Sequence, residues 1–490
     1  MAELHHTSSA QTSSQRFELT TTARTVLLAG VGLGVLSLLL VFFNDDQFHT
    51  RFWTNILLNT LFFTGIALFA LFKYSAGVVA FGGWFVGFKR IWEAYAQFLV
   101  VCLIILLILA GGLYLGYHHL YHWNDAATAS TDKIISGKAG FLNKNFFTFF
   151  TILSMGVWIY LAKKIRSISL DEDLKGDASY SHHQRLRHVS SIALPLIGFL
   201  SAAFFWLWLM SLDAHWYSTM FAWYSSASVF VAMLALTIGI ILYVKSKGYL
   251  PEVTTEHLHD LGKYTFAFSI FWTYLWFSQY MLIWYGNIGE ETIYFRTRFD
   301  HYKVLFYANL VLNFLLPFLI LMRNDTKRKS GTLVVVAILV FFGHWIDYFQ
   351  MVKPGALHTS LELMENRTSV GVLEPLEAKP MEVSQDEGSH ASPAADTGHT
   401  GAIAGHDQDT AHAAAEPAHE ASVPADSHGE DGHGGSGFVA GFTLPGLLDL
   451  GVMIGFLAGF LLFVFREMGK APLIPKNDPY YSESLHHHVM

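Results

Sequence analysis

Apolar runs long enough to cross a lipid bilayer recur along most of the chain. They cover residues 25–43, 52–73, 95–117, 146–163, 189–212, 224–244, 262–285, 303–322, 332–351 and 438–465. A transmembrane helix needs about 20 predominantly apolar residues, because the hydrocarbon core is about 30 Å thick. With 52% hydrophobic and 14% charged residues, the chain is also too apolar for an ordinary soluble protein. We therefore predict an all-α, polytopic membrane protein of about ten helices, arranged as two four-helix bundles and two peripheral helices.

The segments between these runs divide the chain into five parts. Residues 1–24 form a polar tail without the pattern of a cleaved signal peptide. Helices one to nine occupy 25–351, a polar loop 352–437, the tenth helix 438–465 and a second tail 466–490. With the N-terminus in the cytoplasm, the cytoplasmic segments contain about twice as many Lys and Arg residues as the opposite segments. This bias predicts that both termini are cytoplasmic.

The loop 352–437 differs from the rest of the chain in its composition. It is rich in Ala, Gly, Asp, Glu and His, and a segment of this kind cannot bury a hydrophobic core. Histidines spread through it are His390, His399, His406, His412, His419, His428 and His433. Because their spacing is irregular, we expect a disordered periplasmic loop or one that lies on a partner; a metal site is the alternative.

The segment 262–291 carries polar groups at membrane depth. They are Ser278, Gln279 and Asn287. Polar groups in hydrocarbon are costly unless they are partnered or solvated. We therefore expect these side chains to face the bundle interior, and we expect this helix to lie at the centre with the others around it.

Two helices carry glycines at four-residue intervals, which places them on one helix face. They are Gly30 and Gly34 in the first helix and Gly451, Gly455 and Gly459 in the tenth. Small residues allow close backbone approach. One interpretation is that the glycines reflect the glycine content of membrane helices in general. We favour the other, that the two faces dock partner subunits while the eight helices between them form the two four-helix units.

Titratable residues inside the spans or at their rims are the candidates for function. His344 and Asp347 are three residues apart on the ninth helix, so they share a face. Asp213 and His215 end the fifth helix, and Asp449 begins the tenth, all on the predicted outer side. Acids and imidazoles gathered in this way can form a proton path, because each binds and releases a proton. The alternatives are solvated rim carboxylates and a structural hydrogen-bonded pair.

Glu93 is the proton-path candidate at the inner end of the third helix. It follows Lys89 and Arg90 within one turn or so of helix. An ion pair within its own helix is the alternative interpretation.

The residues give little support for a redox centre in this chain. A bis-histidine haem needs ligands on two facing helices, and only His344 is clearly intramembrane. The single cysteine, Cys102, excludes a cysteine-ligated iron–sulfur cluster. His118 and His122 are four residues apart at the outer end of the third helix, where we favour interfacial anchoring over a metal site. We predict no catalytic residue, metal ligand or redox centre.

Four stretches between about residues 200 and 356 carry a family resemblance. They read SLDAHWYSTMFAWYSSAS, DLGKYTFAFSIFWTYLWFSQYMLIWYGNIGEET, NFLLPFLILMRNDTKRKSGTL and GHWIDYFQMVKPG. In order and spacing they resemble the smaller polysulfide-reductase-like (NrfD-like) membrane subunit of bacterial alternative complex III, a quinol:cytochrome c oxidoreductase. The first third of the chain resembles this family in hydropathy alone, and the His-rich loop looks like an insertion.

The resemblance implies a multi-pass subunit of the bacterial inner membrane in a respiratory electron-transport complex. Its partners would be a larger polysulfide-reductase-like sister subunit, an iron–sulfur subunit and c-type cytochrome subunits, with a terminal oxidase as a further candidate. Menaquinol oxidation is associated with the sister, and haem and iron–sulfur centres lie only in partner subunits. Menaquinone is the one cofactor that the resemblance offers for this chain itself.

Three functions therefore compete. The first is a non-catalytic, structural and proton-conducting subunit of such a complex. The second is a quinone-binding redox subunit, which needs an aromatic-lined pocket with a His, Asp or Glu at its head. The third is a stand-alone secondary transporter, for which Pro317 in a span is weak support.

Overall fold

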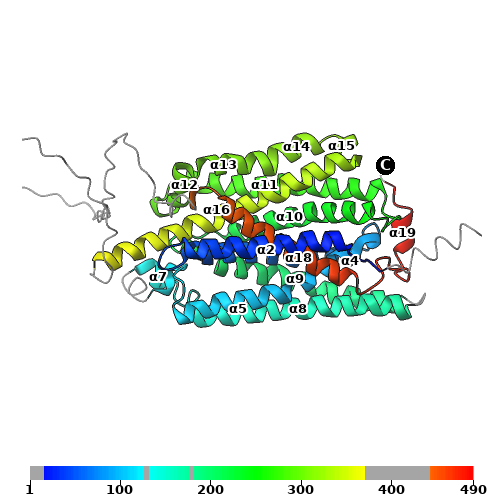
Figure 1. Cartoon of the computed structure of the whole chain (residues 1–490), viewed down its shortest axis with the longest axis horizontal. Coiled ribbons are helices and arrows are strands. Elements are labelled where there is room, and N and C mark those ends of the chain that lie inside the picture. Colours follow the sequence, from blue (N-terminus) through cyan, green and yellow to red (C-terminus); the bar gives the residue numbers. More distant parts are fainter. Residues whose placement is uncertain (1–15, 126–131, 177–179, 370–441, 489–490) are drawn as a thin grey trace, which may run out of the picture. The chain divides into compact units, whose positions relative to one another are not determined.

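The computed structural model describes residues 16–125, 132–176, 180–369 and 442–488, and these residues form helices and no β-strand. The long helices lie side by side along one direction (Figure 1). They are α2 (Thr21–Phe43), α3 (Thr50–Val79), α5 (Leu99–Leu115), α8 (Lys144–Lys175), α9 (Ser181–Trp208), α10 (Thr219–Ser246), α11 (Thr255–Gly286), α16 (Ser330–Ser369) and α18 (Leu447–Met468). The short helix α4 (Lys89–Gln97) leads into α5. Shorter elements are η1 (Val86–Phe88), η2 (His122–Asn124), α7 (Lys133–Gly137), η3 (Met210–Leu212), α12 (Gly289–His301), α13 (Lys303–Leu310), η4 (Val311–Leu315), α14 (Leu316–Leu321), α15 (Asn324–Arg328) and α19 (Tyr481–Leu485).

This architecture confirms an all-α polytopic membrane protein. Nine helical stretches within the described residues are long and apolar enough to cross a membrane. Helix α11 is not among the nine, because its sequence is less apolar, yet it has 32 residues and lies along α10. At ~1.5 Å per residue it is about 48 Å long, which exceeds the hydrocarbon thickness. Together with α11, the nine stretches account for the ten predicted spans.

The helix at the centre of the bundle is α3, and the prediction that 262–291 would be central is wrong. In α3, 89% of the residues of its spanning window are buried. Helix α11 instead buries one stripe that includes Ser269, Trp272 and Gln279. Its other face exposes aromatic side chains such as Tyr274 and Trp284. Aromatic residues therefore form much of the exposed face of α11.

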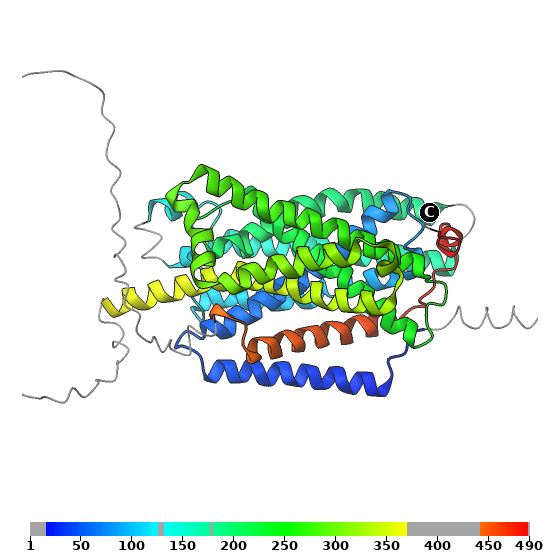
Figure 2. The same ribbon diagram turned by 90° about the horizontal axis from the view of Figure 1, so that it is seen from above.

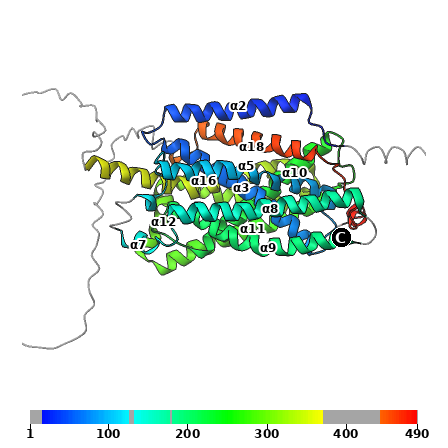
Figure 3. The ribbon, with the colours of Figure 1, turned by 90° about the horizontal axis from the view of Figure 1, so that it is seen from below.

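The glycine faces of the first and last spans pack against each other. A Cβ atom on Gly34 would overlap the backbone of Gly455, and one on Gly30 would lie 2.9 Å from the Cβ of Ala458. Figures 2 and 3 show α2 and α18 side by side at the edge of the bundle. The close-approach interpretation is thus confirmed, but the predicted docking of partner subunits on these glycines is wrong.

The described ends of the chain meet at one end of the bundle. Arg16 forms an isolated antiparallel bridge with Pro472, and the rings of Phe17 and Phe465 lie 5.2 Å apart. The segment before α2 and the segment after α18 therefore lie against each other.

The ninth span extends further than predicted. Helix α16 continues through residues 352–369, which we expected to belong to a disordered loop. The tenth span begins at Leu447 instead of 438. The seven loop histidines from His390 to His433 lie outside the described residues.

Candidate functional site

A buried carboxylate, Asp347, joins four helical segments inside the bundle. Its Oδ1 accepts hydrogen bonds from the Tyr224 hydroxyl of α10 and from Asn309 Nδ2 of α13, the latter at 2.7 Å. Its Oδ2 accepts one from the indole N–H of Trp272 in α11, at 2.9 Å. The residue has no exposed surface. Both carboxylate oxygens accept hydrogen bonds from buried donors, which is what burial of a carboxylate requires.

A π-helical turn positions Asn309 and Asn313 beside this carboxylate. The turn, η4, includes Asn313, whose Nδ2 donates to Asn309 Oδ1 at 2.5 Å. Gly343 of α16 permits the contact, because a Cβ atom there would lie 2.9 Å from the Cβ of Leu312. Single π-helical turns within helices are frequent at functional sites.

His344 lies one turn before Asp347 and is also fully buried. Its Nδ1 lies 3.0 Å from the Ser228 hydroxyl, and its ring meets Trp272 edge to face at 5.4 Å. Within the described part of the chain, its Nε2 has no hydrogen-bond partner. The predicted shared face of His344 and Asp347 is confirmed, and that face points into the bundle.

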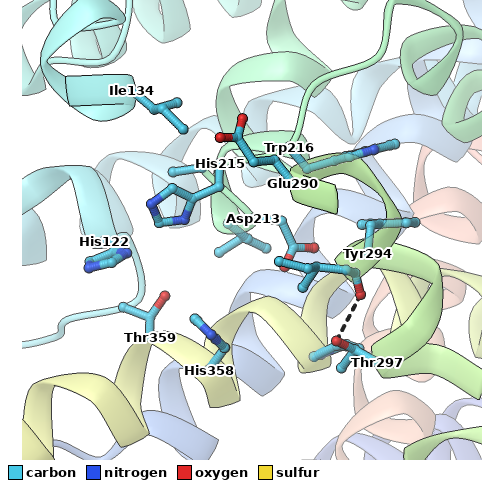
Figure 4. A pocket seen from close by; sticks show the side chains of 14 residues that line it. His122, Ile134, Asp213, His215, Trp216, Glu290, Tyr294, Thr297, His358 and Thr359 are labelled. Carbon is cyan, nitrogen blue, oxygen red and sulfur yellow. Dashed lines mark hydrogen bonds between the residues drawn. The ribbon is translucent and has the colours of Figure 1, made fainter. Parts of the chain in front are cut away.

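At one end of the bundle, a cavity of about 310 Å³ opens among polar side chains. We call it the vestibule, and Figure 4 shows that its lining side chains come from several different segments. They include Asp213, His215, Glu290, His358, Trp216 and Tyr294. The sequence predicted a common location for Asp213 and His215, and the structure places both in this wall. Trp216 stacks on Tyr294 with ring centroids 3.9 Å apart, which forms the aromatic part of the wall.

His215 is held by a carboxylate from another segment. Its Nε2 is hydrogen-bonded to Oδ2 of Asp132, while Oδ1 of Asp132 caps α7 by accepting from the backbone N–H of Ile134 and Ile135. Although partial burial opposes ionisation, the hydrogen bonds from His215 and from the backbone lower the pKa of Asp132. The vestibule thus has an acid–imidazole pair at its rim.

Asp213 forms an ion pair with Arg298, which the sequence analysis missed. The distance from Arg298 Nη2 to Asp213 Oδ2 is 3.1 Å. Arg298 also donates to the backbone oxygens of Gln350 and Tyr294, and its guanidinium lies 3.3 Å from the Tyr294 ring centroid. Only 3% of Arg298 is exposed.

A second, much smaller cavity, which we call the inner cavity, is lined in part by Arg298. Its volume is about 10 Å³, and its polar lining comes from Tyr224, Gln279, Arg298 and Gln350. Tyr294 lines both this cavity and the vestibule. Tyr224 also donates to Asp347, so the buried carboxylate lies next to the lining of the inner cavity.

Asp449 belongs to a different cluster. Its Oδ2 accepts from Arg51 at 2.9 Å, and its Oδ1 lies 3.3 Å from Lys353 Nζ. It also accepts from the backbone N–H of Gly446 at the start of α18. These contacts tie α18 to α3 and α16, which is a structural role.

Glu93 pairs with Arg90 of its own helix, as the alternative interpretation expected. Arg90 Nη1 lies 2.6 Å from Glu93 Oε2, and the Ser169 hydroxyl donates to Glu93 Oε1 at 2.7 Å. Arg90 also pairs with Asp173 of α8. The group joins α4 to α8.

The three polar residues of α11 differ in location. Gln279 is 3% exposed and faces the inner cavity, whereas Ser278 is half-buried. Asn287 is exposed and ends α11 in a left-handed conformation with φ 47°, so its predicted interior position is wrong. Asparagine is one of the few residues that adopt this conformation readily, and it therefore serves as a helix end.

Of the residues around Asp347, only the asparagines could have been identified from the sequence. Asn309 and Asn313 are four residues apart in an otherwise apolar run, a spacing that places them on one helix face. Tyr224 and Trp272 could not be told from the many other aromatic residues. Protein-family models and characterised proteins, searched with this sequence, give no match.

Proposed function

We propose that the chain is an integral membrane subunit of a respiratory quinol:electron-acceptor oxidoreductase complex, and that it conducts protons from the vestibule to Asp347. One observation carries the proton-conducting part: a fully buried carboxylate is hydrogen-bonded to Tyr224, which lines a cavity next to the Asp213–Arg298 pair. Ionisable groups inside membrane proteins are costly and commonly mark proton relays.

The complex itself is inferred from the family resemblance of residues 200–356. In this proposal the chain lies in a bacterial inner membrane with both termini in the cytoplasm. The c-type haem and iron–sulfur centres belong to partner subunits, and a larger sister subunit oxidises menaquinol. The contact between the segment before α2 and the segment after α18 supports a common side for both termini.

Purification and one variant test the two parts of the proposal. Mild detergent extraction of the tagged full-length chain should bring c-type cytochromes and menaquinone with it. In vesicles containing that complex, Asp347→Asn should lower the number of protons translocated per electron, while quinol oxidation continues. Asp300→Asn, at an exposed carboxylate outside the vestibule lining, is the matched control. An unchanged ratio in Asp347→Asn would remove the proton-conducting role.

The vestibule favours quinone binding as a second candidate function. Its volume of about 310 Å³ is at the lower end of ligand pockets, which are roughly 300–1,000 Å³. The stacked Trp216 and Tyr294 would cover a quinol ring, and Asp213 or His215 could accept a hydrogen bond from its hydroxyl. A bound quinone would supply two-electron redox chemistry there. Labelling by a photoreactive menaquinone analogue, lost in Trp216→Ala, would support this function.

A further inference from the structure

An apolar groove, which we call the lateral groove, is lined by α10, α16 and α18. Its lining comes from residues 235–243 of α10, residues 334–342 of α16 and Leu457 of α18. Its volume is about 470 Å³, which lies within the roughly 300–1,000 Å³ of ligand pockets. Tyr243 is the only lining residue with a polar side-chain group, so the groove suits a hydrocarbon chain.

The lateral groove has the depth of one membrane leaflet. Tyr243 lies three residues before the end of α10, and Val334 lies four residues after the start of α16, so both belong to the same end of the groove. At ~1.5 Å per residue, 235–243 and 334–342 each extend about 12 Å along their helices. One leaflet contributes roughly 15 Å of hydrocarbon, half of the bilayer core. A transmembrane helix of another subunit would need a groove through both leaflets, whereas a lipid acyl chain needs only one.

A lysine lies at the end of the groove that is nearest the helix ends. Lys247 follows Tyr243 by one helical turn, and its Nζ lies 5.7 Å from the centroid of the Tyr243 ring. Lys247 is exposed and forms no ion pair within the part of the chain that the structure describes. Lys245 differs, because its ammonium donates to the backbone oxygens of Leu250 and Val253. The ammonium of Lys247 is therefore available to a phosphate at the level of the lipid headgroups.

We propose that the lateral groove binds one phospholipid with an anionic headgroup. Its acyl chain lies along residues 235–243 and 334–342, and its phosphate lies beside Lys247. The groove is open beside Gly239, where a Cβ atom would meet nothing within 4 Å. The site is separate from the vestibule and does not depend on proton conduction.

Photolabelling of the full-length chain tests the site. The chain, with any subunits that accompany it, is reconstituted into phosphatidylcholine vesicles that contain a small fraction of phosphatidylglycerol with a diazirine on its acyl chain. After illumination, the labelled peptides are identified by mass spectrometry. Labels should concentrate in 235–243 and 334–342, and phosphatidylcholine with the same diazirine should label these segments several-fold less.

Gly239→Leu tests whether the acyl chain lies in the groove. The leucine side chain would occupy the open space beside the backbone, so labelling of the two segments should fall several-fold. Gly198→Leu in α9 is the matched control, because a Cβ atom at Gly198 also meets nothing within 4 Å and Gly198 does not line the groove. Equal labelling in the two variants would mean that the lipid only contacts the outer surface, and the site would be wrong.

Lys247→Gln tests the headgroup contact without changing the packing of the bundle, since Lys247 is exposed. Labelling by the phosphatidylglycerol probe should fall to the level of the phosphatidylcholine probe. Lys164→Gln removes an exposed lysine of α8 and should leave the labelling unchanged. If the two probes already label the wild type equally, the groove does not select an anionic lipid and the proposal fails.

A photoreactive menaquinone analogue distinguishes the other occupant that a hydrocarbon groove could accept. It should label 235–243 and 334–342 less than the phosphatidylglycerol probe does, because a quinone ring has no anionic group for Lys247. Labelling of these segments by the quinone analogue, with none by phosphatidylglycerol, would overturn the lipid site and assign the groove to an isoprenoid chain.

Discussion

Gly34 of α2 lies directly against Gly455 of α18, and neither position has room for a Cβ atom. The contact joins the first and last spans of the described chain, where two backbones approach without intervening side chains. In membrane helices, packing of this kind replaces much of the hydrophobic driving force that is available in water.

Gly455→Ala should therefore lower the thermal stability of the protein in detergent. Overpacking a close contact typically costs about 1–3 kcal/mol, and here the added methyl meets backbone, which cannot move aside. Gly32→Ala is the control, because a Cβ atom at Gly32 meets nothing within 4 Å. Equal unfolding temperatures for the two variants would contradict the contact.

Asp449→Leu should destabilise the protein more strongly than the glycine variant. It leaves Arg51 and Lys353 without their shared carboxylate, and Lys353 has no exposed surface. Removing one partner of a buried ion pair costs about 3–5 kcal/mol. Asp300→Ala breaks an exposed pair with Arg296 and should change little, as thermal unfolding can show. If Asp449→Leu and the wild type have the same unfolding temperature, the ion pairs of Asp449 do not stabilise the packing of α18.

Acidic pH should lower the folding stability of the protein because the imidazole of His118 is buried. Burial lowers the pKa of this imidazole to about 4, although its hydrogen bond to the Leu109 oxygen acts in the opposite direction. The unfolded chain, with a pKa near 6.5, binds the proton first, so stability falls as pH drops from about 6.5 toward 4. The full loss is on the order of 3 kcal/mol.

The unfolding temperature measured at pH 7 and pH 5 checks this dependence. His118→Gln should reduce the difference between the two pH values, and His182→Gln, at the half-buried position 182, should not. A difference that survives His118→Gln would assign the acid sensitivity to other groups.

His344→Ala should spare assembly but lower the number of protons translocated per electron. The variant removes the imidazole beside Ser228 and Trp272 and leaves the four helical segments at Asp347 in contact. Proton uptake by vesicles during quinol oxidation measures the effect, with Ser228→Ala as a milder variant. If only Asp347→Asn reduces the ratio, His344 is a structural residue.

The sequence predicted the spans well because hydropathy depends only on residue type and run length. It also predicted that His344 and Asp347 share a face, because residues three positions apart in an α-helix lie on the same side of it. It failed for α11, where aromatic residues such as Tyr274 face outward. Aromatic side chains suit both a bundle interior and a membrane-facing surface, so their number does not decide between the two.

The site itself could be predicted only in part, because its partners come from distant segments. Arg298 lies between two predicted spans and was not among the candidate residues, yet it pairs with Asp213, which is 85 residues earlier. Asp449 looked like a member of the same acidic group, but its two cationic partners lie on α3 and α16. Which charges meet depends on tertiary packing that residue spacing within one helix does not specify.

The pairing of α2 with α18 also has a consequence for biosynthesis. Helix α2 is the first of the described spans to leave the ribosome, and the glycine surface that receives it belongs to the last. During translation α2 must therefore wait in lipid, its small-residue face uncovered, until nearly the whole polypeptide has been inserted. The contact between Gly34 and Gly455 can form only after α18 has been inserted.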